Sequence, residues 1–181
     1  ACIGQRAGKS ITTAMLCSYS THMFLKLQRP TEVFGLLRDS ILTGTVVGLT
    51  FKRAFNLLWM PFHNMLESSP WFKEYHAMLD FYSEKYGEEL YKFKDIFIQY
   101  KHRNMYYYVS GPSKRTLRGD TRVLAATDEV GWFPYGEESE ERERQSANGV
   151  YDALDRSLSN VRSAAHNLIM QGRNVPMALA F

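Results

Sequence analysis

Short runs of β-branched and other apolar residues alternate with longer segments of helical period throughout this sequence. Residues 45–51 and 123–127 have the composition of strands, whereas residues 147–170 place apolar side chains at steps of three and four. Strands that alternate with helices favour an α/β fold with a mostly parallel central sheet flanked by helices. A chain of 181 residues is the size of one domain.

The other predicted elements follow from the same patterns. In the first helix, from about Lys9 to Leu27, we expect one buried face formed by Ile11, Met15, Tyr19 and Met23, and Pro30 ends this unit. We also expect residues 1–3 to be the last residues of a buried strand, and a helix with a break or kink at Pro61. Another helix should start at Pro70, with an aromatic face that packs in the core. Residues 95–100 and 105–110 should form a hairpin, and residues 175–181 should start a further strand.

Composition excludes several classes of protein. The chain is 45% hydrophobic and 23% charged, which is typical of globular domains rather than disordered ones. No apolar run approaches the ~18 residues of a membrane-spanning helix, and the N-terminus lacks the apolar core of a signal peptide. The two cysteines are too few for a disulfide scaffold, and the five histidines lack zinc-ligand spacing. Because strand-like residues stand at both ends, we expect the chain to be part of a longer protein.

The segment Gly4–Ser10 carries the strongest chemical signal. It reads Gly-Gln-Arg-Ala-Gly-Lys-Ser, follows a short apolar stretch and opens the first helix, which is the context of a phosphate-binding loop. Backbone N–H groups and the helix N-terminus would face the phosphates. Lys9 would reach the β- and γ-phosphates and the Ser10 hydroxyl would bind Mg²⁺. The expected nucleotide contacts are Gly4, Gln5, Arg6, Ala7, Gly8, Lys9, Ser10 and Ile11. The usual first glycine would fall on Ile3, so the loop is one residue short.

A second signal is the pair of acids after the strand at 123–127. Asp128 at a strand tip can hold Mg²⁺, and Glu129 can polarise an attacking water as a general base. The alternative is two solvated acids at a strand end. Arg6 is the first candidate for a cation that stabilises the γ-phosphate, and Arg115, Arg118 and Arg122 are weaker candidates.

These segments resemble the large terminase subunit of tailed bacteriophages. Gly4–Ser10 is similar to the shortened, arginine-bearing Walker A motif of that family. Leu117–Asp120 resembles the segment before Walker B, Asp128–Phe133 the Asp-Glu motif with its trailing aromatic, and Leu154–Arg162 the helix after Walker B. The resemblance covers nearly all of the chain, and the order and spacing of the motifs carry it.

The resemblance implies a partial P-loop ATPase domain of the ASCE type over residues 1–181. It implies ATP and Mg²⁺ as cofactors, with Lys9 and Ser10 on the phosphates and metal, Asp128 on the metal, and Glu129, Arg6 and Lys9 as catalytic groups. It also implies a ring, usually a pentamer, on the portal of a procapsid in the cytoplasm of an infected bacterium. The partners would be double-stranded DNA, the portal protein and the small terminase subunit, and the whole protein would also be an endonuclease.

The chain departs from the family at several places. Many terminases carry the loop arginine four residues before the lysine, where this chain has Gln5, so the role of Arg6 is open. The adenine-contacting segment before Walker A, the coupling motif after residue 181 and the nuclease carboxylates are not in this sequence.

Charge is unevenly distributed along the chain. Residues 92–122 hold eight Lys and Arg against two acids, and residues 128–145 hold seven acids against two Arg. The basic stretch is either a solvated loop or a surface for a polyanion. In the second case Lys101, Arg103, Lys114 and Arg115 would contact the DNA backbone. Two other functions stay open: a helicase-like ASCE motor, and a nucleotide-binding module that does not hydrolyse its ligand.

Overall fold

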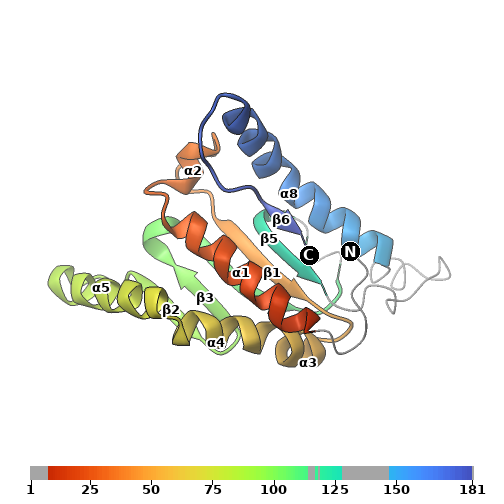
Figure 1. The fold of residues 1–181 in the computed structure, drawn as a ribbon, viewed down its shortest axis with the longest axis horizontal. Coiled ribbons are helices and arrows are strands. Elements are labelled where there is room, and N and C mark those ends of the chain that lie inside the picture. Colours follow the sequence, from red (N-terminus) through yellow and green to blue (C-terminus); the bar gives the residue numbers. More distant parts are fainter. Residues whose placement is uncertain (1–7, 114–116, 118, 128–146, 181) are drawn as a thin grey trace.

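The computed structural model describes residues 8–113, 117, 119–127 and 147–180. They form an α/β structure with one six-stranded sheet (Figure 1). The strands are β1 (Leu42–Val47), β2 (Tyr91–Lys94), β3 (Phe97–Tyr100), β4 (Met105–Ser110), β5 (Thr121–Thr127) and β6 (Leu179–Ala180). The helices are α1 (Lys9–Leu25), α2 (Pro30–Val33), α3 (Phe51–Ala54), the π-helical η1 (Phe55–Trp59), α4 (Met60–Ser68), α5 (Pro70–Tyr86), the 3₁₀ turn η2 (Lys101–Arg103) and α8 (Ala147–Met170).

The sheet is mixed rather than uniformly parallel. Its strand order is β2-β3-β4-β1-β5-β6. The pairs β4–β1, β1–β5 and β5–β6 are parallel, and the pairs β2–β3 and β3–β4 are antiparallel. The prediction of an α/β fold is confirmed. The prediction of a mostly parallel sheet holds for four strands only, because the antiparallel strands β2 and β3 extend one side.

The predicted hairpin of strands 95–100 and 105–110 is confirmed as β3 and β4. The turn η2 joins them, and Asn104 follows it in the left-handed conformation with φ 53°. Asparagine tolerates this conformation better than most residues. Strand β2 was not predicted, although Tyr91–Lys94 alternates aromatic residues with lysines.

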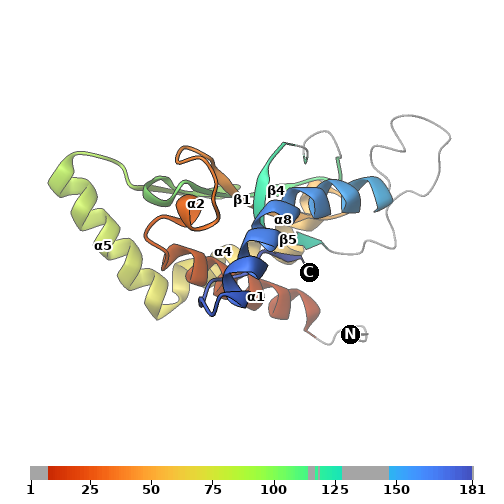
Figure 2. The ribbon, with the colours of Figure 1, turned by 90° about the horizontal axis from the view of Figure 1, so that it is seen from above.

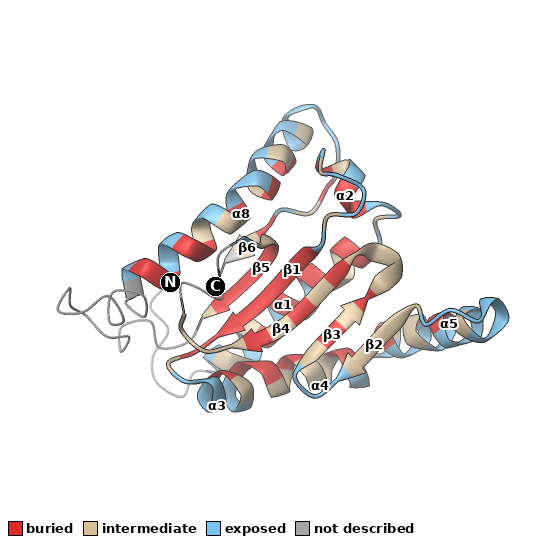
Figure 3. Cartoon of the chain, turned by 180° about the vertical axis from the view of Figure 1, so that it is seen from behind, coloured by how far each residue is buried: buried red, intermediate tan, exposed pale blue. Residues whose placement is uncertain are grey.

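Helices cover one face of the sheet more fully than the other. Helices α1 and α4 lie together across the face shown in Figure 1, and α8 runs along β5 and β6. Figure 3 gives the opposite view, in which no described helix lies over β3 and β4. Helix α5 extends away from the sheet (Figure 2). The described helices are therefore distributed unequally between the two faces.

The buried face of α1 differs from the prediction. Ile11, Met15 and Tyr19 are 57%, 58% and 60% exposed. The buried positions are Ala14, Cys17, Ser20, Thr21, Phe24 and Leu25. Both sets recur at helical spacing, so periodicity alone could not choose between them. The small residues Cys17 and Thr21 lie beside the buried Tyr107 of β4, and their size lets α1 approach that strand.

Close packing also determines the sequence of β1. Gly44 pairs with Tyr107 of β4, and a Cβ on Gly44 would lie 2.3 Å from a ring carbon of Tyr107. Only glycine leaves room for this ring.

A π-helical turn, η1, immediately precedes the predicted break or kink at Pro61. The N–H of Met60 donates to the carbonyl of Phe55, five residues earlier, and α4 continues through Pro61. Proline cannot donate to the carbonyl four residues before it, and a π-helical turn immediately before Pro61 accommodates this loss.

Candidate functional site: the amino end of α1

The described part of the predicted phosphate-binding loop is Gly8–Ile11. Gly8 precedes α1 in the left-handed conformation, with φ 73°, where a side chain would cause backbone strain. Lys9, Ser10 and Ile11 form the first helical positions, and the Gly8 carbonyl accepts a hydrogen bond from the N–H of Thr12 (2.9 Å). The structure thus reproduces the predicted change from loop to helix at Gly8.

The amino end of α1 has the electrostatics of an anion site. The first N–H groups of a helix have no partner within the helix. No side chain of the described residues caps this end, and the first turn contains no acid. Lys9 is exposed and adds a full positive charge to the positive end of the helix dipole. Ser10 is half-buried and brings a hydroxyl oxygen to the same turn.

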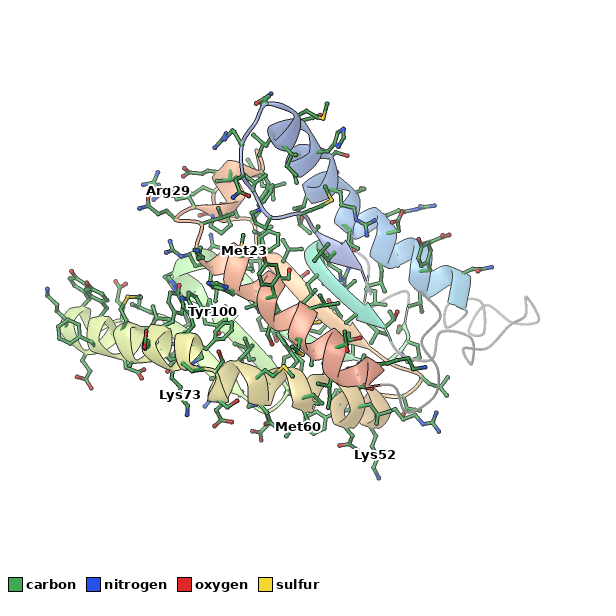
Figure 4. The ribbon with its side chains drawn as sticks, in the orientation of Figure 1. Met23, Arg29, Lys52, Met60, Lys73 and Tyr100 are labelled. Atoms are coloured by element: carbon green, nitrogen blue, oxygen red, sulfur yellow. The ribbon has the colours of Figure 1, made fainter. Side chains whose placement is uncertain are left out.

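Three parallel strands end together beside this helix terminus. Val47, the last residue of β1, pairs with Ser110 of β4 and with Thr127 of β5. Figure 1 shows the amino end of α1 at this carboxyl-end edge of the sheet. Figure 4 shows Lys52 of α3 on the same side of the molecule. Ligands of open α/β sheets commonly bind at the carboxyl ends of the strands.

Several predicted site residues lie outside the described residues. They are Gly4, Gln5, Arg6 and Ala7 of the loop, the acids Asp128 and Glu129, and Lys114, Arg115 and Arg118. Thr127, which precedes the two acids in sequence, is the last described residue of β5. Among the described residues, no group of three or more His, Cys, Asp or Glu side chains could hold a metal ion.

Arg122 does not belong to this site. It lies at the amino end of β5, about 17 Å of strand away from Thr127 at ~3.3 Å per residue. Its guanidinium is fully buried. It donates to Asp120 Oδ2 (2.8 Å), to the Tyr108 hydroxyl (2.9 Å) and to Thr45 Oγ1 (2.9 Å). The prediction that Arg122 is a candidate γ-phosphate cation is therefore wrong, because the side chain is held in the sheet.

The network around Arg122 was missed in the sequence. Tyr108 also donates to Asp120 Oδ2 (2.6 Å), and the Leu117 carbonyl accepts from Arg122. The sequence did contain a signal for this network: the acid Asp120 stands two residues before Arg122, at the start of a strand. A buried arginine with these acceptors positions β5 against β1 and β4, and a buried charge without them would cost several kcal/mol.

Two of the four residues of the predicted basic surface, Lys101 and Arg103, lie among the described residues. Lys101 and Arg103 lie in η2, at the amino end of β4, whereas Lys114 and Arg115 follow its carboxyl end in sequence. Lys101 pairs with Glu89 (2.5 Å), and Arg103 donates to the Gln28 carbonyl. Lys101 and Arg103 therefore contribute to local structure at the edge opposite the amino end of α1.

A histidine and tyrosine cluster joins α5 to the hairpin and was also missed. Tyr75 Oη lies 2.6 Å from His102 Nε2, and His76 Nε2 lies 2.9 Å from Tyr100 Oη. Burial lowers the pKa of His102 to about 4, and burial also lowers the pKa of His76. Burial raises the pKa of Tyr100, which is fully buried. This cluster is part of the core rather than of the candidate site.

Two hollows in the described part of the surface lie at the amino end of β5. One of about 840 Å³ is lined by residues that include Thr43, Tyr106 and Tyr108, and another of about 380 Å³ lies between β5 and α8. Both include Gly119, Asp120 and Thr121, at the amino end of β5. The described residues at the amino end of α1 expose the Lys9 side chain beside a helix end without a side-chain cap.

None of the described helices is long and apolar enough to cross a membrane.

Comparison with known proteins found no similar protein. The chain matches no known protein family, no curated protein and no solved structure.

Proposed function

We propose that this chain binds ATP with Mg²⁺ and hydrolyses it. The observation that carries the proposal is the position of Gly8, Lys9 and Ser10. They form the uncapped amino end of a 17-residue helix, at the edge where β1, β4 and β5 end. A left-handed glycine, the N–H groups of a first helical turn, a lysine and a hydroxyl are the groups that bind triphosphates in P-loop proteins.

Each residue has a distinct task in the proposed reaction. The N–H groups of the first turn of α1 and the ammonium of Lys9 bind phosphate oxygens and stabilise the charge that develops in the transition state. The Ser10 hydroxyl and the Asp128 carboxylate are oxygen ligands suited to Mg²⁺, which supplies further neutralisation when bound. Glu129 orients a water and accepts its proton as the water attacks the γ-phosphorus; the bond from this phosphorus to the β–γ bridging oxygen breaks, and ADP and inorganic phosphate are released.

The resemblance to terminases extends the proposal to a motor. We infer that hydrolysis drives translocation of double-stranded DNA into a viral procapsid. A non-hydrolysing nucleotide-binding module is the second candidate, because Gly8, Lys9 and Ser10 account for binding of phosphate and not for its hydrolysis. The rate of hydrolysis by Glu129→Gln separates the two.

Nucleotide binding tests the first step. We expect Lys9→Ala to weaken binding of a fluorescent ATP analogue in the presence of Mg²⁺ by about tenfold or more, since a charged phosphate contact is lost. Lys26→Ala is the matched control, because Lys26 is an exposed lysine at the other end of α1. Equal affinities of both variants and the unaltered chain would contradict the proposed site.

The DNA partner has its own test. We expect charge reversal at Lys114 and Arg115 to reduce the stimulation of ATP hydrolysis by duplex DNA, with a smaller salt dependence. Lys73→Glu with Lys94→Glu is the control, because both lysines are exposed and Lys73 lies on α5 (Figure 4). Unchanged stimulation in the first variant would refute a DNA contact at these residues.

A further inference from the structure

One face of the sheet carries a row of aromatic side chains that no described helix covers (Figure 3). The row consists of Phe97 of β3 and of Tyr106 and Tyr108 of β4, which are all half-buried. The ring centroids of Phe97 and Tyr106 lie 5.5 Å apart, and those of Tyr106 and Tyr108 lie 5.6 Å apart. Tyr107, between the two tyrosines, lies against α1, so Tyr106 and Tyr108 point to the opposite face of the sheet.

The hollow of about 840 Å³ is lined by Tyr106 and Tyr108 of this aromatic row. Thr43 of β1 pairs with Tyr106 of β4, which pairs with Gln99 of β3, and all three line the hollow. Residues 39–41 before β1 and residues 119–121 at the start of β5 line it as well. Sites for small organic ligands commonly have volumes of ~300–1,000 Å³, so the hollow has the size of such a site.

The buried network around Arg122 holds one side of the hollow in place. The Arg122 guanidinium donates to the Tyr108 hydroxyl and to Asp120 Oδ2, and Tyr108 donates to the same carboxylate oxygen. Among the described residues these bonds to Asp120 all end at Oδ2, and Oδ1 can accept a further hydrogen bond. Side chains that are already held in one conformation lose little freedom when a ligand binds.

The polar groups of the hollow favour a ligand that donates hydrogen bonds. Asp39 and Asp120 bring carboxylates to the lining, and Gln99 brings an amide oxygen. None of the described residues that line the hollow is a lysine or an arginine, and the Arg122 guanidinium beneath it is occupied by its own acceptors. The described lining therefore offers a phosphate group no cation.

The aromatic row favours a ligand that is planar. Heteroaromatic rings such as nucleobases stack on the faces of tyrosine side chains. Amino groups on such a ring are donors in the plane of the ring, where carboxylate and amide oxygens can accept from them.

We propose that this hollow binds a planar heteroaromatic compound that carries amino groups and no phosphate, the chemical class of an aminopurine nucleoside. The ring stacks on Tyr106, and its amino group donates to a carboxylate of the hollow. The lining residues Thr43, Tyr106 and Thr121 stand at the amino ends of β1, β4 and β5, at the edge of the sheet opposite Lys9. The inference therefore does not depend on the proposed ATP hydrolysis.

The fluorescence of 2-aminopurine riboside tests the site, because stacking on another aromatic ring quenches the emission of this compound. Titration with the full chain should give saturable quenching with a dissociation constant of about 0.01–1 mM. Tyr106→Leu should weaken binding about tenfold or more, because the stacking surface is lost, whereas Tyr106→Phe should retain it. Gln99→Leu should weaken binding about threefold or more, because a hydrogen bond is lost.

Three controls make the test specific to the hollow. Tyr151→Leu should not change the affinity, because Tyr151 is an exposed tyrosine on α8 outside the hollow. Lys9→Ala should bind the riboside as the unaltered chain does, which separates this site from the proposed phosphate site. The 5′-monophosphate of the same nucleoside should bind about fivefold more weakly or less, because Asp39 and Asp120 repel its charge. Circular dichroism establishes that each variant is folded.

Four results would overturn the proposal. One is the absence of saturable quenching up to about 5 mM riboside. Another is a folded Tyr106→Leu variant that binds as tightly as the unaltered chain. A loss of binding in Lys9→Ala would place the riboside at the amino end of α1. Equal or tighter binding of the monophosphate would contradict the proposed class of ligand.

Discussion

Histidine 102 shows how a single polar side chain is accommodated in this core. It contacts Tyr75 through Nε2, and its Nδ1 lies 3.2 Å from the Leu90 carbonyl. Removal from water disfavours the charged ring, and this desolvation is the largest cause of the lowered pKa. The neutral ring is therefore the form that stabilises the contact between α5 and the hairpin.

This protonation preference predicts a loss of stability in acid. The pKa of His102 falls from 6.5 to about 4 on folding, so the folded state binds fewer protons than the unfolded state between these values. The free energy of unfolding should fall by about 1–2 kcal/mol as the pH falls from about 6.5 to 4. The fall is smaller than the full pKa difference would give, because the His102 ring is partly exposed and solvent screens its charge. Urea titrations at several pH values measure it.

Replacement of the ring tests the assignment. His102→Gln should flatten the pH dependence in that range, because glutamine does not titrate. His166→Gln is the matched control on the exposed side of α8 and should leave the dependence unchanged. Equal pH dependence of the unaltered chain and His102→Gln would assign the acid sensitivity to another group.

The contact between Gly44 and Tyr107 predicts that alanine at position 44 destabilises the fold. A methyl at Gly44 would overlap the ring, so Gly44→Ala should lower the free energy of unfolding by about 1–3 kcal/mol. At Gly111 the nearest atom would lie 3.7 Å away, and Gly111→Ala should cost much less. Similar costs at both positions in urea denaturation would show that Tyr107 does not lie over β1.

At the scale of elements, the sequence predicted where the helices lie along the chain better than it predicted which face of a helix is buried. Helix α8 occupies residues 147–170 as predicted, because its apolar period is long and uninterrupted. Helix α1 was placed correctly, but its exposed and buried faces were exchanged. The larger side chains of α1 were assumed to be buried, whereas small side chains pack against Tyr107. Strand β2 was missed because four residues give a short pattern.

The two faces of α1 predict opposite responses to truncation. Leu25 is 1% exposed, so Leu25→Ala should cost about 2–4 kcal/mol of unfolding free energy. Met15 lies on the exposed face, so Met15→Ala should change it by no more than about 0.5 kcal/mol. Thermal or urea denaturation of the two variants decides between the faces. A large cost at Met15 with a small cost at Leu25 would restore the original prediction.

For the whole molecule, the fold brings residues 8–11 to the edge where β1, β4 and β5 end. Sequence reasoning predicted a loop that opens the helix at Lys9, but the strand expected before it, at residues 1–3, lies outside the described residues. Arg122 lies at the amino end of β5, whereas Thr127 lies at its carboxyl end. The strand predicted at residues 123–127 therefore already separated Arg122 from the amino end of α1, although its burial among Thr45, Tyr108 and Asp120 depends on contacts between strands that local patterns do not encode.

The release of inorganic phosphate from Mg²⁺-ATP is the most direct test of the proposed function. The unaltered chain should hydrolyse ATP. Glu129→Gln should bind ATP with similar affinity and hydrolyse it about 100-fold or more slowly, because a general base is lost. Equal rates in both proteins, or binding without any hydrolysis by the folded, unaltered protein, would contradict the account.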